Sequence, residues 1–168
     1  MSYVSISGPS LEAIVKELNE DVKHQLEGRT YRASNELRNA ALLVLRGQRG
    51  GRRYKVPGTY KKQKDPVTGK VKSGRYYTAS APGEPPAVRT GAFRLSWQPD
   101  PRCSGAFNAY WARIKSDLRT DNGRFTLGEI LEKGTPGGQM APRPHHDRIL
   151  QKAEPSVVRI YNAPYFNG

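Results

Sequence analysis

The sequence predicts an α+β domain in which a long N-terminal helix packs on a small antiparallel β-sheet, with short C-terminal helices and a long basic loop or hairpin. Apolar residues recur every three or four positions through the first 45 residues, which is typical of an amphipathic helix. Loops rich in proline and glycine follow, and short segments of strand or helix pattern come after them. A chain of 168 residues is most simply one domain, so we expect residues 1–168 to fold together.

The N-terminal helix is expected to begin near Ser10, a residue type that caps helix N-termini. Its apolar residues follow one helical face and predict a surface helix with one buried stripe: Leu11, Ile14, Val15, Leu18, Val22 and Leu26. The pattern resumes after Gly28 and ends at Gly47. One long helix and two consecutive helices fit this pattern equally well.

Shorter elements are expected in the second half of the chain. Residues 90–98 predict a short helix that leads into a strand, with Thr90 able to cap the helix. Residues 106–118 fit a strand or a helix, since the alternation of their apolar and polar residues favours neither. Residues 126–133 begin with the spacing of a capping box and are followed by Gly134, so they predict another helix.

The C-terminal region predicts a helix over residues 142–153 that ends before Pro155. The apolar residues at 157–161 then predict a terminal strand. Residues 162–168 form a tail that contains Tyr165 and Phe166, and we expect these aromatic side chains to dock on a partner or to pack back onto the same domain.

The positive charge is concentrated in one segment. Residues 46–75 contain eleven Lys or Arg and a single acid, so they carry ten of the thirteen net charges of the protein. Tyr54 and Tyr60 stand among these cations, and Tyr76 and Tyr77 follow them directly. Turn signals at residues 65–69 predict a long basic hairpin over 46–78 or a segment that orders only on a partner. The candidate contacts to DNA or to an acidic protein surface are Arg49, Arg52, Arg53, Lys55, Lys61, Lys62, Lys64, Lys70, Lys72 and Arg75. An ordinary solvated loop is the alternative interpretation.

Residues 79–91 contain three prolines, which fix φ and remove backbone donors, so this segment predicts a stiff connector. Residues 79–96 read ASAPGEPPAVRTGAFRLS, and this phrase resembles one found in head–tail joining (neck or tail-completion) proteins of long-tailed bacteriophages. A second phrase from residue 131 to 144 is also similar, although Lys133 replaces an aromatic residue of the family and His145 replaces a Phe.

The resemblance implies a non-enzymatic virion protein of the phage neck, which forms a ring around the DNA channel and works without a cofactor. Its expected partners are further copies in a ring that is six-fold or twelve-fold, neighbouring connector and tail proteins, and packaged DNA. The expected subunit or partner contacts are Pro82, Glu84, Pro85, Pro86, Arg89, Gly134, Thr135, Met140, Arg143, Tyr165 and Phe166. A tail terminator that caps the tail tube and a free nucleic-acid-binding protein remain as alternatives.

An enzyme or metal site has weak support in the sequence. His145, His146 and Asp147 are adjacent, but neighbouring residues on a helix point about 100° apart and no third ligand stands at useful spacing, so we interpret them as a polar helix start. The single cysteine, Cys103, has no second thiol for a disulfide or a zinc site. No apolar run of membrane-spanning length and no signal peptide is found, so we expect a protein that is soluble in the host cytoplasm during assembly and then part of the virion.

Overall fold

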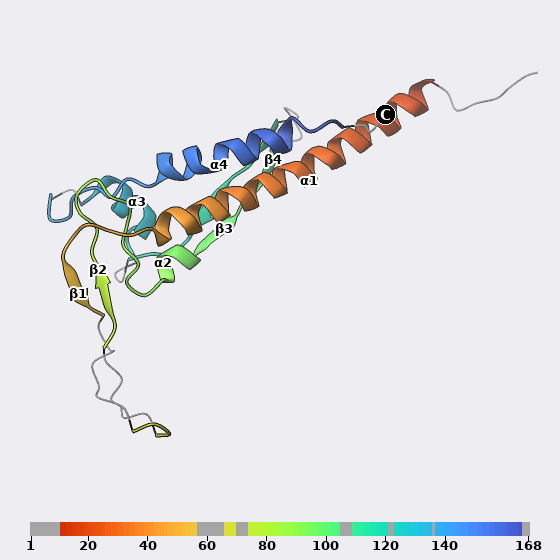
Figure 1. Cartoon of the computed structure of the whole chain (residues 1–168). Coiled ribbons are helices and arrows are strands. Elements are labelled where there is room, and N and C mark those ends of the chain that lie inside the picture. The colour runs from red at the N-terminus through yellow and green to blue at the C-terminus, as the bar shows by residue number, and fades with distance from the viewer. Residues whose placement is uncertain are drawn as a thin grey trace, which may run out of the picture.

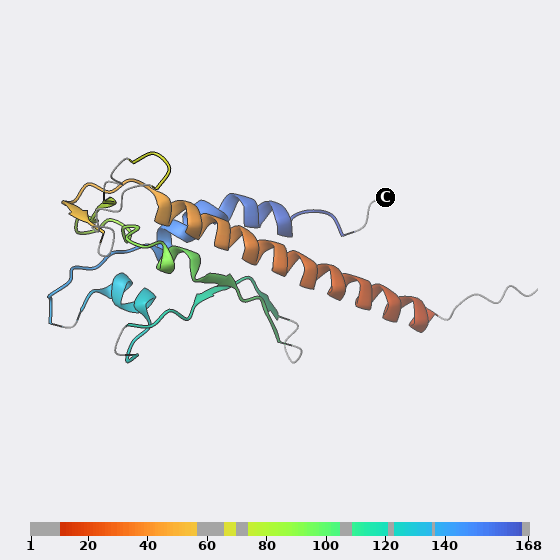
Figure 2. The same ribbon diagram turned by 90° about the horizontal axis from the view of Figure 1, so that it is seen from below.

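The computed structural model describes residues 11–56, 66–69, 74–104, 109–120, 123–135 and 137–165. It confirms the α+β class: a long N-terminal helix, small antiparallel sheets and shorter C-terminal helices (Figure 1). Helix α1 (Leu11–Arg46) runs along the molecule, and α4 (His146–Tyr161) lies beside it in both views (Figures 1 and 2). Ser10, the expected cap, lies outside the described residues.

Helix α1 is continuous over 36 residues, so the one-helix alternative is correct. Its buried stripe is confirmed only in the second half of the helix, where it comprises Ala33, Leu37, Ala40, Ala41 and Leu45. The prediction is wrong for the first half, since Ile14, Val15 and Leu18 are 40–48% exposed. The reason is geometric: the N-terminal end of α1 extends beyond the elements that pack on its other end (Figure 2).

The strands form three two-stranded antiparallel ribbons instead of the single sheet expected. Strand β1 (Arg53–Lys55) pairs with β2 (Tyr76–Thr78), and β3 (Trp97–Pro99) pairs with β6 (Ile114–Ser116). The third ribbon joins β4 (Arg102–Ser104) to β5 (Ala109–Trp111). Strands of three residues each cannot shield a broad apolar face, so α1 and α4 supply most of the core.

Two expectations for the middle of the chain are confirmed. Helix α2 (Ala92–Leu95) leads directly into β3. Its N-cap position is Gly91 and not the expected Thr90, although the Thr90 hydroxyl accepts a hydrogen bond from the amide of Ala92 at 3.3 Å. The ambiguous segment 106–118 contains strands β5 and β6, so the strand alternative holds there.

Helix α3 (Leu127–Lys133) has the predicted limits, although the side chain of Thr126 makes no capping hydrogen bond. The predicted terminal strand is wrong, because α4 begins at His146 and continues through Pro155 to Tyr161. Proline in a helix interior costs about 3 kcal/mol. This cost is offset because Ile149, Ala153 and Val157, spaced four residues apart, pack into the same core as α1.

The core lies between α1, α4 and the β3–β6 ribbon. Its buried members are Leu37, Ala40, Ala41, Leu45, Trp97, Ile149 and Ala153. Two polar contacts fix the ribbon to α1: Arg38 Nε donates to the carbonyl of Trp97 at 3.1 Å, and the amide of Arg113 donates to Ser34 Oγ at 3.1 Å. The C-terminal end of α1 is therefore the anchored end, and the loops discussed below gather around it.

Candidate interaction surface

The proline-rich connector, residues 79–91, is tied to the end of α1 by two charged side chains. The guanidinium of Arg49 donates to the carbonyl of Pro86 at 3.3 and 3.1 Å, and burial lowers its pKa. The carboxylate of Glu84 accepts from the amide of Gly50 at 3.1 and 3.0 Å and from the amide of Ala81 at 2.8 Å. Both hydrogen bonds lower the pKa of Glu84, and the one from the Gly50 amide has the larger effect. Both side chains thus hold the connector within the chain.

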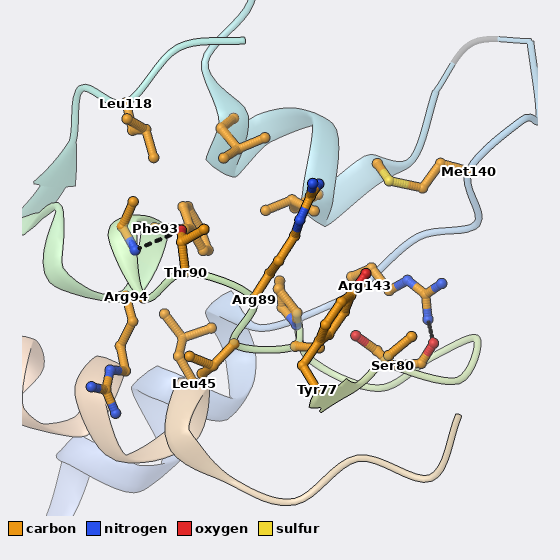
Figure 3. Close-up of a pocket in the computed structure, with 18 residues that line it drawn as sticks. Leu45, Tyr77, Ser80, Arg89, Thr90, Phe93, Arg94, Leu118, Met140 and Arg143 are labelled. Atoms are coloured by element: carbon orange, nitrogen blue, oxygen red, sulfur yellow. Dashed lines mark hydrogen bonds between the residues drawn. The ribbon is translucent and has the colours of Figure 1, made fainter. Parts of the chain in front are cut away.

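The connector and the segment that holds Arg143 lie against each other. The guanidinium of Arg143 donates to the carbonyls of Ser80 and Ala81, and Figure 3 shows the bond to Ser80. The amide of Gly83 donates to the carbonyl of Pro142 at 3.4 Å. Segments that are about 60 residues apart in the sequence therefore form one packed unit, which the spacing of the motifs alone did not reveal.

The loop after α3 is closed by its Gly-Thr step. Gly134 has φ of 80°, and a Cβ there would stand 2.7 Å from the carbonyl oxygen of Met140. The amide of Thr135 donates to the carbonyl of Met140 at 3.1 Å, and the amide of Met140 donates to Thr135 Oγ1 at 2.9 Å. Gly134 and Thr135 therefore shape this loop, and the half-buried Met140 is held at its base.

These segments enclose a pocket of about 500 Å³, which we call the motif pocket. Helices α2 and α3, the end of α1 and strand β2 contribute to its lining (Figure 3). Its apolar side chains include Leu45, Val88, Phe93, Leu118, Leu127 and Leu131. Three arginines line it, Arg89, Arg94 and Arg143, and none of the described lining residues is acidic. This lining suits an apolar group that carries a negative charge.

Residues of the connector take different positions at this surface. Pro85 and Pro86 are buried, so they serve packing within the chain. Pro82 and Arg89 are exposed, and the side chain of Arg89 reaches across the motif pocket toward α3 (Figure 3). Arg89 is thus the candidate contact best placed to meet a partner in this pocket.

The predicted basic hairpin is confirmed at its base, where β1 pairs with β2. Tyr54 stands opposite Tyr77 and the two rings stack with centroids 6.0 Å apart. The guanidinium of Arg53 lies 4.6 Å from the ring centroid of Tyr76, and that of Arg52 lies 5.9 Å from the centroid of Tyr54. Cations and exposed aromatic rings therefore alternate on this ribbon, as the sequence suggested.

The remaining candidates of the hairpin divide into two groups. Arg52, Arg53, Lys55 and Arg75 are exposed, whereas the guanidinium of Arg49 is engaged with the connector. The other candidates lie outside the described residues: Lys61, Lys62, Lys64, Lys70 and Lys72.

The sequence missed a carboxylate beside the histidine pair. Glu132 of α3 comes within 4.8 Å of ligand atoms of His145 and His146, so the fold brings to the pair a third candidate ligand that sequence spacing does not show. Glu132 Oε2 accepts from the amide of His145 at 2.8 Å and from the amide of His146 at 3.3 Å. It also lies 2.7 Å from Nδ1 of His145. This is the arrangement of a helix N-cap supplied from another helix.

The ring of His145 belongs to this cap and to the core. It is fully buried, and its centroid lies 5.5 Å from that of Phe93 and 5.9 Å from that of Trp97. Its Nδ1 lies 2.9 Å from the carbonyl oxygen of Arg143, which can only accept, so this nitrogen carries the proton. Burial lowers the pKa of His145 and favours the neutral ring. We therefore assign the cluster to the attachment of the start of α4 to α3 through Glu132.

The C-terminal tail packs back onto its own chain as far as Tyr165. The buried guanidinium of Arg29 donates to the carbonyls of Tyr161 at 3.1 Å, Ala163 at 2.5 Å and Pro164 at 2.6 Å. The ring of Tyr165 stacks on it, with the guanidinium carbon 3.8 Å from the ring centroid. Of the two alternatives, packing on the same domain thus describes Tyr165, and Phe166 lies outside the described residues.

Comparison with known proteins finds no similarity: no protein-family model, no curated protein and no solved structure matches this chain. Among the described residues, no helix combines the length and the apolar character that a membrane crossing requires.

Proposed function

We propose that this chain is a non-enzymatic structural protein of a bacteriophage neck, which joins the DNA-filled head to the tail as part of a ring around the DNA channel. One observation carries the proposal: the two segments that resemble the head–tail joining family pack together through Arg143 and Gly83 around a single pocket. In a protein built for assembly, loops positioned by a rigid scaffold make the contacts with neighbours. Residues 79–91 and 134–143 have that character here.

The basic hairpin supports the same function. Its exposed arginines and stacked tyrosines suit contact with the phosphate backbone of DNA or with an acidic rim of a neighbouring ring. In the proposed assembly, the hairpin approaches the DNA channel, while the motif pocket faces other neck or tail subunits. The protein would then reside in the host cytoplasm during assembly and in the virion afterwards.

A tail terminator that caps the tail tube is a closely related alternative, since the same loops would then contact tail subunits. A free nucleic-acid-binding protein is the more distant alternative, and the alternation of cations and tyrosines on the β1–β2 ribbon favours it. It requires the isolated chain to bind nucleic acid in a strongly salt-sensitive way, with affinity falling about 10³-fold or more between about 50 and 200 mM salt for six or more phosphate contacts.

The test is electron microscopy of lysates from a phage in which this gene is inactivated. Separate DNA-filled heads and complete tails support joining, heads accompanied by abnormally long tails support the terminator, and joined particles refute both. Complementation with the wild-type chain controls for effects on other genes. Complementation with an Arg52→Ser, Arg53→Ser chain tests the hairpin, and full recovery of infectivity would refute its role.

A further inference from the structure

The first turns of α1 carry an apolar face that the described part of the chain leaves uncovered. We call residues 12–27 the α1 projection. Ile14 is 40% exposed, Val15 48% and Leu18 45%, and these positions share one face of the helix. Figure 2 shows this end of α1 extending past the rest of the molecule. An amphipathic helix of this kind is recognised by an apolar groove that accepts side chains spaced three or four residues apart.

The α1 projection is also acidic, in contrast to the rest of the chain. It contains five acids and two lysines, a net charge of −3 in a protein of net charge +13. The five acids are all exposed: Glu12, Glu17, Glu20, Asp21 and Glu27. Two such projections would repel each other if they paired side by side, so a basic surface is the favoured partner.

The motif pocket has the complementary properties. Its apolar side chains can receive residues such as Ile14 and Leu18, and none of the described lining residues is acidic. The guanidinium of Arg143 is engaged with the carbonyls of Ser80 and Ala81, so the charge match depends on Arg89. Arg89 reaches across the pocket with its side chain exposed, so it is placed to meet a carboxylate of an entering helix (Figure 3).

The projection cannot reach the motif pocket of its own molecule. Leu18 belongs to the projection and Leu45 lines the pocket, and α1 is one continuous helix between them. At about 1.5 Å per residue, the two positions lie about 40 Å apart along the helix. The partner that supplies the acidic helix must therefore be a different molecule.

We infer that the α1 projection of one copy of this chain docks in the motif pocket of a second copy. The contact is heterologous, because it joins two different surfaces: the α1 projection of one molecule and the motif pocket of the next. Repetition of a heterologous contact produces a closed ring when the rotation between copies closes, and an open filament when it does not. The inference deepens the proposed function by naming the contact within the ring, and its test uses the isolated protein.

The test is a charge exchange read by sedimentation velocity of the full-length chain over a range of concentrations. We expect the wild-type chain to self-associate. We test two variants: one carries both Glu17→Arg and Glu20→Arg, and the other carries Arg89→Glu alone. Each should weaken association by about tenfold or more, since like charges then face each other. A single chain that carries all three substitutions should regain association. Glu154→Arg is the matched control, because Glu154 is exposed on α4 outside both surfaces.

Circular dichroism of each variant separates loss of association from loss of folding. A wild-type chain that stays monomeric at about 100 μM overturns the inference, as does unchanged association of both reversed variants or failure of the combined chain to recover. A dissociation constant of about 100 μM corresponds to a binding free energy near −5.5 kcal/mol, which is weaker than a stable assembly needs.

Cross-linking gives an independent measurement of the same contact. In a Cys103→Ser background, a mixture of chains carrying Leu18→Cys and chains carrying Thr90→Cys should form disulfide-linked pairs between the two kinds of chain. Preferential linkage of Leu18→Cys chains to one another would instead indicate pairing of two projections and would refute the inference. Joined particles in the gene-inactivated phage would refute the neck function while leaving the contact intact, so the two failures are distinguishable.

Discussion

Removal of the Glu132 carboxylate should destabilise the protein more than its position on a short surface helix suggests. Glu132 Oε2 accepts hydrogen bonds from two amides at the start of α4 and lies 2.7 Å from the buried Nδ1 of His145. Loss of a helix cap costs about 1 kcal/mol, and loss of a hydrogen bond to a charged group costs about 1.5–3 kcal/mol. The ring of His145 keeps its own hydrogen bond, since its Nδ1 is bonded to the carbonyl of Arg143. We expect Glu132→Ala to lower the free energy of unfolding by about 3 kcal/mol.

The measurement is thermal unfolding followed by circular dichroism at pH 7. For a chain of this length, about 3 kcal/mol corresponds to a decrease in Tm of about 6–12 °C. Glu129→Ala is the matched control on α3, because Glu129 makes only an exposed pair with Lys133 at 3.0 Å, worth about 0.3–0.5 kcal/mol. Equal Tm values for the two variants would refute the trans cap as a stabilising feature.

Three further predictions follow from the same contacts. Because the pKa of His145 is lowered in the folded chain, the unfolded chain binds more protons than the folded chain as the pH falls through 6.5. The urea midpoint should therefore be lower at pH 5 than at pH 7, and this decrease should be smaller in His145→Gln. A decrease of equal size in both chains would contradict this reasoning. Gly134→Ala should cost about 1–3 kcal/mol more in chemical denaturation than Gly138→Ala, since both glycines have positive φ but only Gly134 has no space for a Cβ; equal costs would remove the steric argument. Arg29→Lys should speed amide hydrogen exchange in residues 162–165, because lysine cannot reproduce the planar fork that serves three carbonyls and stacks on Tyr165; unchanged exchange would show that the tail is held by other contacts.

The periodic parts of the sequence were the predictable ones. Helix α1, helix α3 and the α2–β3 step follow from apolar spacing and from capping residues, which are local signals. The end of α4 was not predictable in this way, because Pro155 is a local stop signal and only packing against α1 reveals that the helix continues. The exposed face of the α1 projection was missed for the same reason, since a stripe of apolar residues does not show how much of the helix other elements pack against.

The candidate surface shows the same division between local and non-local information. The basic hairpin and its turn were evident from composition, and the structure confirms the pairing of β1 with β2. Glu132 was missed because it belongs to α3 and reaches the histidine pair only through the fold. The roles of Arg49 and Glu84 were also hidden, since a charged residue in a proline-rich or basic segment looks like a contact for a partner until its internal acceptors and donors are known.

The charge distribution along α1 connects the two proposals. The acidic projection lies at one end of α1, and the Arg-lined motif pocket and the basic hairpin lie at the other end. If the projection of one copy pairs with Arg89 in the pocket of the next, that contact does not use Arg52 and Arg53 at the β1–β2 ribbon. They are then the charges left to meet DNA or an acidic neighbour. A ring assembled in this way would concentrate positive charge at the hairpins, so the self-association contact and the DNA contact use different arginines and can be separated by mutation.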